Sequence, residues 1–121
     1  MLTPDSNVKE VEGISCDERQ RIKDFLQGAV YCWCKHNKSE WLSLRIFLGG
    51  ENYDWQGTPL NVLFEKHRIT MGKDVETSVK HAGLDAGSIL KQVIKDDKRV
   101  FETRKNEGFR EYLWTGTERD A

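Results

Sequence analysis

The chain has 121 residues and a mass of 14.1 kDa, which is the size of one domain with a single modest core. Apolar residues make up 37% and charged residues 32%, and 19 basic side chains nearly balance 20 acidic ones to give a net charge of -1. No apolar run reaches the length of a membrane helix, and the N-terminus lacks the features of a signal peptide. The composition excludes collagen-like, membrane-spanning and disulfide-scaffold proteins, and it predicts a cytoplasmic protein.

The three cysteines, Cys16, Cys32 and Cys34, are odd in number and do not suit a disulfide framework. On a helix, the thiols of Cys32 and Cys34 point in directions about 200° apart, so they cannot share a metal ion or form a bridge. We interpret them as small packing residues in a reducing compartment.

Residues 1–13 show no apolar period and are predicted to form a disordered tail ahead of a single domain at 14–114. Order begins at a capping box, in which Ser15 and Glu18 each satisfy a free backbone amide. A helix is predicted over 16–36, because apolar residues then recur at helical spacing. Its stripe consists of Ile22, Phe25, Leu26, Ala29, Val30 and Trp33. A stripe wider than the core beneath it would also form the contact face of a homodimer.

Two further helices are predicted in the middle third. The first spans 39–48, with Ser39 as its N-cap and the pair at 49–50 as its glycine stop. The second begins at Thr58 and Pro59, a cap residue followed by proline in the first turn. The large core residues predicted for the whole chain are Phe25, Trp33, Trp41, Phe47, Phe64 and Trp114.

The polar connection between these two helices holds two aromatic side chains and is open to two interpretations. Tyr and Trp are enriched in binding hot spots, so the segment suits recognition of a partner protein. Alternatively, the rings fold back to fill the gap between the helices, as long connections in small domains usually need such anchors. The candidate partner-binding residues are Tyr53, Asp54, Trp55 and Gln56.

The last third is predicted to hold two short helices and a hairpin. Asp74 caps the first helix and Gly83 ends it, and Asp85 caps the second helix, which continues to about Asp97. Strands at 99–105 and 109–114 then surround a turn. Residues 115–121 are predicted to form a second disordered tail.

The register of the hairpin follows from its charges. Pairing Lys105 with Arg110 also sets Arg104 opposite Glu111, an opposite-charge pair. A slip of one residue would set Arg104 against Arg110 instead. The preferred register also pairs Phe101 with Trp114 and Thr103 with Tyr112 on one face.

The order helix, turn, helix and hairpin over residues 75–114 resembles a winged helix-turn-helix. The residues that match are Ala82 and Gly83 at the turn, Leu84 and Ile89 as apolar anchors, and Asp85 as the cap of the second helix. The resemblance implies a mainly helical α+β fold, with about five helices before a C-terminal hairpin. It also implies binding to duplex DNA.

Local charge points in the same direction. Between Lys91 and Arg110 seven basic residues stand against four acidic ones, a balance of +3. A polar helix face beside a basic hairpin would follow a phosphate backbone. The alternative is that these are ordinary solvated side chains, with the hairpin lysines blocking strand-to-strand aggregation. The candidate nucleic-acid-binding residues are Ser88, Lys91, Gln92, Lys95, Arg104, Lys105 and Arg110.

The sequence contains no pattern typical of catalysis. His36, His67 and His81 lack the spacing of metal ligands, and no nucleophile elbow, phosphate loop or dinucleotide fingerprint is present. We therefore predict a protein that is not an enzyme and uses neither cofactor nor metal. Two functions remain: a nucleic-acid-binding or regulatory module, or a protein-interaction module that uses residues 51–56 or the surface of the first helix.

Overall fold

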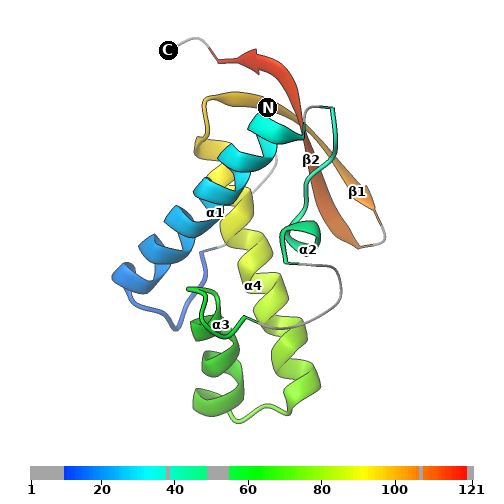
Figure 1. Ribbon diagram of the computed structural model, residues 1–121. Helices are drawn as coiled ribbons and strands as arrows, with labels where there is room; N and C mark the ends of the chain where they lie inside the picture. Colours follow the sequence, from blue (N-terminus) through cyan, green and yellow to red (C-terminus); the bar gives the residue numbers. More distant parts are fainter. Residues whose placement is uncertain (1–9, 38, 49–54, 107, 120–121) are drawn as a thin grey trace.

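The computed structural model describes residues 10–37, 39–48, 55–106 and 108–119. These residues form a mainly helical α+β fold that ends in an antiparallel hairpin, which confirms the predicted α+β class and the C-terminal hairpin. Figure 1 shows α1 crossing α4, α3 beside the lower half of α4, and the hairpin descending from the upper end of α4. The elements are α1 (Cys16–His36), α2 (Leu44–Phe47), α3 (Asn61–Glu65), the π-helical turn η1 (Lys66–Thr70), α4 (Val75–Asp96), β1 (Arg99–Asn106) and β2 (Phe109–Glu118).

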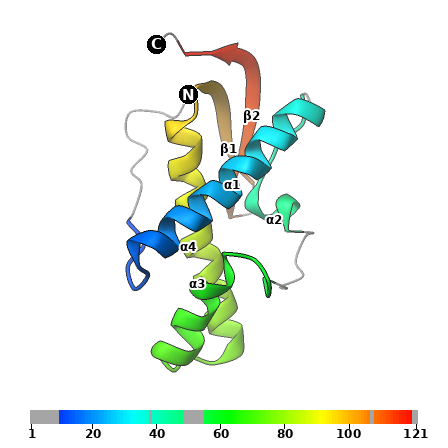
Figure 2. The same cartoon turned by 60° about the vertical axis from the view of Figure 1, so that its left-hand side comes forward.

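The first helix begins at the predicted capping box. The Glu18 amide donates to Ser15 Oγ at 3.0 Å, and the Ser15 amide donates to Glu18 Oε1 at 2.8 Å. The buried side of α1 repeats every four residues, and Figure 2 shows this helix lying across α4. Phe25, predicted for the core, is 38% exposed, because a helix that crosses its neighbour buries only a narrow line of side chains. That line consists of Ile22, Leu26, Val30 and Cys34.

The predicted helix over 39–48 is wrong in its first half. Residue Leu42 instead joins the sheet, since its backbone exchanges two hydrogen bonds with Tyr112, at 2.7 and 2.9 Å. The chain therefore stays extended until Ser43, whose hydroxyl accepts from the Ile46 amide at 3.1 Å and caps the short α2. Pairing with β2 outweighs the local helix propensity of this segment.

The two short helices predicted within residues 75–97 form one continuous helix, α4. The predicted stop at Gly83 is wrong, and the described residues form four α-helices rather than about five. The reason is tertiary: one apolar stripe continues past Gly83 and is buried by the other elements, so packing outweighs the low helix propensity of glycine. That stripe comprises Ser78, Ala82, Ala86, Ile89, Leu90, Val93 and Ile94.

The hairpin has the predicted register. Lys105 pairs with Arg110 and Arg104 with Glu111, as the charge argument requires. The two further predicted pairs, Phe101 with Trp114 and Thr103 with Tyr112, are also present. The second strand is longer than predicted, because residues 115–118 continue β2 and Thr115 Oγ1 donates to the Val100 carbonyl at 2.9 Å.

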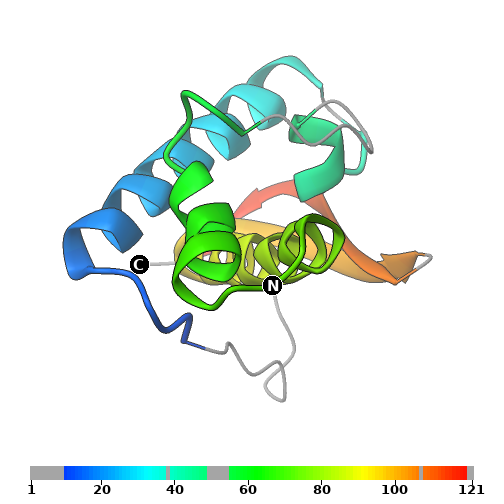
Figure 3. The same cartoon turned by 90° about the horizontal axis from the view of Figure 1, so that it is seen from below.

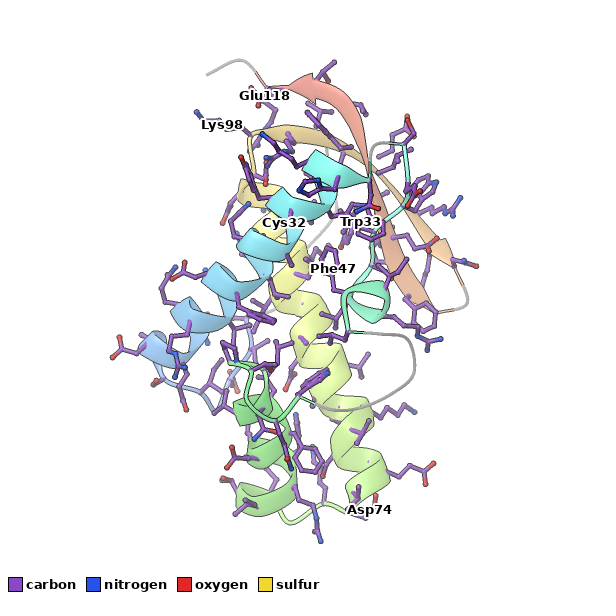
Figure 4. The ribbon with its side chains drawn as sticks, viewed as in Figure 1. Cys32, Trp33, Phe47, Asp74, Lys98 and Glu118 are labelled. Carbon is purple, nitrogen blue, oxygen red and sulfur yellow. The ribbon has the colours of Figure 1, made fainter. Side chains whose placement is uncertain are left out.

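The core lies between α1, α4 and the hairpin. Seen from below, α1 and α2 lie on one side of α4 (Figure 3). The largest fully buried side chains of the core are Tyr112 and Phe101. Both were predicted to lie on the hairpin, but neither was predicted as a core residue. Among the large residues predicted for the core, Trp33 and Phe47 are partly buried (Figure 4). Their rings pack edge to face, with the ring centres 5.9 Å apart. Three others are also only partly buried: Trp41, Phe64 and Trp114.

Candidate functional site

A groove of about 740 Å³ lies between α2, residues 79–91 of α4 and the tip of the hairpin. The helix α4 provides one long side of it. Gly83 and Gly87 on this side would carry a Cβ atom in open space, so the helix backbone borders the groove directly. The lining residues from α4 are Val79, Lys80, Gly83, Leu84, Gly87, Ser88, Leu90 and Lys91.

The opposite side of the groove is built by segments that are distant in the sequence. Trp55, at the start of the chain segment that leads to α3, also lines the groove. The apolar lining of the groove is therefore mixed with cationic side chains. The lining residues outside α4 are Leu44, Arg45, Leu48, Trp55, Lys105, Gly108, Phe109, Arg110 and Tyr112.

The charges of the groove all have one sign. Four elements each contribute at least one cation to the lining, and none of the described lining residues is acidic. This contrasts with the whole chain, whose net charge is only -1. Like charges around one hollow produce a local positive potential that attracts anionic ligands. The five cations are Arg45, Lys80, Lys91, Lys105 and Arg110.

Arg45 and Arg110 have contacts that limit their freedom. The guanidinium carbon of Arg45 lies 3.7 Å from the centre of the Phe109 ring, a stacking geometry that holds its plane against the hairpin tip. Arg110 Nη1 lies 3.4 Å from Thr103 Oγ1 on the neighbouring strand. Neither contact neutralises the positive charge.

Four of the seven predicted nucleic-acid-binding residues meet at this groove. They are Ser88 and Lys91 from α4 and Lys105 and Arg110 from the hairpin. Ser88 Oγ donates to the Leu84 carbonyl one turn earlier, at 3.2 Å. The structure thus brings together a helix face and a basic hairpin that are about 15 to 20 residues apart in the chain.

The other three predicted residues lie outside the groove. Gln92 donates to Asp96 Oδ2 at 2.8 Å, and Lys95 is exposed one turn beyond the end of the groove. Arg104 lies on the other side of the hairpin, where it donates to Glu111 Oε1 at 2.7 Å and stacks over the Trp41 ring at 4.0 Å. Successive side chains of a strand point to opposite faces, so Arg104 and its neighbour Lys105 lie on opposite faces of the hairpin.

The candidate partner-binding segment is described only in part. Tyr53 and Asp54 lie outside the described residues. Trp55 is 4% exposed and belongs to the core, which agrees with the interpretation of this ring as an anchor, and Gln56 is exposed.

Sequence reasoning missed two cations of the groove, Arg45 and Lys80. The signal for Lys80 was present, because Lys80, Leu84 and Lys91 share one side of a continuous helix. Because a break was predicted at Gly83, Lys80 was assigned to one helix and Lys91 to the next, and their shared side was not recognised. No local signal identifies Arg45, since its approach to the hairpin depends on the bridge at Leu42.

Among the residues that the structure describes, no three His, Cys, Asp or Glu side chains are grouped to hold a metal ion. Within the same residues, no helix is both long enough and apolar enough to cross a bilayer. No family model matches the chain, and neither the curated proteins nor the solved structures compared with it include a match.

Proposed function

We propose that the protein binds nucleic acid, with duplex DNA as the preferred ligand, through the groove between α4 and the hairpin tip. The observation that carries the proposal is the set of five cations, from four elements, around a hollow with no described acidic lining residue. Phosphate backbones are recognised mainly by Arg and Lys side chains, and such contacts supply much of the binding free energy.

The order of the elements supports a duplex rather than a single strand. The segment α3–η1, a short turn and the long helix α4 precede the hairpin, as the helix pair precedes the wing in a winged helix-turn-helix. In this form of the proposal α4 as a whole is the helix that approaches the DNA. Lys105 and Arg110, directly paired near the hairpin tip, serve as the basic wing.

The experiment is fluorescence anisotropy of a labelled random duplex, titrated with the protein at about 50 and 200 mM salt. Lys91→Gln removes a cation of the groove, and Lys95→Gln removes the same charge one helical turn away from it. We expect salt-dependent binding, weakened by Lys91→Gln and nearly unchanged by Lys95→Gln. One lost phosphate contact should also reduce the slope of log affinity against log salt by about 1.

Equal loss in the two variants would contradict the groove and indicate attraction by general surface charge. Absence of binding at low salt would contradict nucleic-acid binding itself. It would leave the protein-interaction module as the working hypothesis. A labelled single strand of the same sequence, tested in parallel, decides between duplex and single-stranded ligands.

A further inference from the structure

A compact cluster of titratable side chains lies outside the groove, where η1 and the turn after it meet α4. Lys73 Nζ lies 2.7 Å from His67 Nδ1 and 2.9 Å from His81 Nδ1, so one ammonium group bridges two imidazole rings. The two ring centres are 5.5 Å apart, edge to face. His67 is buried, at 6% exposure, whereas Lys73 and His81 are partly exposed.

The cluster continues on the other side of His67. Its Nε2 atom lies 2.7 Å from Asp85 Oδ2, and Lys66 Nζ approaches the same oxygen at 2.6 Å. Lys66 also donates to the Glu12 carbonyl at 2.8 Å. The cluster therefore links η1, the turn after it, α4 and the segment before α1.

The positions of the protons follow from the geometry. A lysine ammonium can only donate, so the Nδ1 atoms of both His67 and His81 must accept with a lone pair. His67 then carries its proton on Nε2 and donates it to Asp85. Both imidazoles are consequently neutral while Lys73 is charged. In this state Lys73 Nζ donates to both rings, and His67 uses both of its ring nitrogens.

We propose that Lys73, His67 and His81 form an acid-sensitive latch that holds the α3–η1 segment against the N-terminal half of α4. A proton added to Nδ1 of His81 turns an acceptor into a donor that faces the Lys73 ammonium. That hydrogen bond is lost, and two positive charges meet at less than 3 Å. The Lys73 ammonium then leaves the rings, and the turn over 71–74 loses this attachment to α4.

The charges around the rings favour opening in acid. Among the described residues, the charges that act on the His81 ring are those of Lys73, Lys80 and His67, with Asp85 as the one group of opposite sign. His67 faces Lys73, His81 and Asp85, and the charge of Asp85 is already shared with Lys66. Once His81 is protonated, its charge adds to those of Lys66 and Lys73 around the single Asp85 carboxylate.

The pKa of His81 agrees with this arrangement. Partial burial and the nearby Lys73 ammonium lower the pKa of the His81 imidazole below its ordinary value of 6.5. A base whose pKa is lower in the closed state binds its proton more readily when the segment opens. The latch is therefore closed above pH 6.5 and loses stability as the pH falls below that value.

Hydrogen exchange of the full chain at pH 7.5 and 5.5, divided by the intrinsic exchange rates, tests the latch. We expect amides of η1 and of the first half of α4 to exchange faster at pH 5.5. The change should reach at most about ten-fold per pH unit for each linked proton, while amides of the hairpin serve as the internal reference. Uniform acceleration over all elements would contradict a local latch.

Lys73→Met removes the ammonium that lies within 3 Å of both rings and should abolish most of the acid response, because a protonated His81 then has no ammonium at hydrogen-bond distance. His36→Gln removes a histidine in the last turn of α1 and should leave the response unchanged. An undiminished response in Lys73→Met overturns the proposal. If that variant fails to fold, an NMR titration of the wild-type protein decides instead, since a His81 pKa at or above 6.5 also overturns it.

Discussion

Trp55 lies at a position where the two interpretations of its segment predict opposite results. As a binding residue it would be solvent-exposed, and its removal would spare the fold. In the structure its ring is 4% exposed, and it borders the groove from the core side. The exposed neighbour Gln56 is the natural comparison, because it shares the same segment without entering the core.

We expect Trp55→Ala to lower the free energy of unfolding by about 3 to 5 kcal/mol, the usual cost of emptying a large aromatic site in a core. Gln56→Ala should change it by less than about 0.5 kcal/mol, as surface substitutions usually do. Urea unfolding followed by tryptophan fluorescence measures both. A folded, fully stable Trp55→Ala protein would show that this ring is not a core residue.

At the scale of elements, α4 determines both the groove and the latch. One side of this helix is buried in the core, another carries Lys80, Leu84, Ser88 and Lys91 toward the groove, and a third carries His81 and Asp85 toward η1. Leu84, predicted as an apolar anchor, is 63% exposed on the groove side. All of these placements require α4 to continue through Gly83.

Gly83→Ala tests this continuity. Gly83 has no positive φ, and a Cβ added there meets nothing within 4 Å. We therefore expect alanine to raise the free energy of unfolding by up to about 1 kcal/mol, the difference in helix propensity. A turn at this position would give the opposite sign.

Gly72 is the matched comparison for that substitution. A methyl group added to its Cα atom would also meet open space, but its φ of +68° belongs to the left-handed region. Gly72→Ala should therefore destabilise the protein by about 1 to 2 kcal/mol. Thermal unfolding of the two variants, measured together, separates the effect of backbone conformation from that of an added methyl group.

At the scale of the whole molecule, Tyr112 joins the hairpin to the helical part. Its side chain is fully buried, and its backbone forms the bridge with Leu42. Burial raises the pKa of the Tyr112 hydroxyl to about 12. The folded state therefore favours the neutral phenol, and this contribution to stability is complete below pH 10 and lost as the pH rises toward 12.

We expect the free energy of unfolding to fall by about 2 to 3 kcal/mol between pH 10 and 12 through this residue, since each pKa unit corresponds to about 1.4 kcal/mol. Tyr112→Phe should flatten that part of the pH profile. Tyr31→Phe, at a side chain that is half exposed on α1, should leave it unchanged. Urea titrations across this range give the result, and an equal slope in wild type and Tyr112→Phe would contradict it.

Local rules in the sequence were sufficient for several features of the fold. The capping box at Ser15 and Glu18 places the start of α1, because its hydrogen bonds join residues three apart. The charges of the hairpin select its register, because a slip by one residue sets like charges opposite each other. Ser88 and Lys91 share a helix face and Lys105 pairs with Arg110 in the hairpin, and both placements are local properties.

Tertiary packing decided the rest. Leu42 pairs with a strand 70 residues away, which removes half of a locally favoured helix. Gly83 remains helical because the surrounding elements bury the apolar stripe of α4 on both sides of it. The free energy of this burial comes from tertiary packing and is not part of the helix propensity of any single residue. Arg45 and Lys80 line one groove only because distant segments pack together. Lys73 contacts two histidines six and eight residues away, where η1 and α4 meet. The sequence shows where each charged residue lies along the chain. Which residues surround that charge in space depends on how the elements pack.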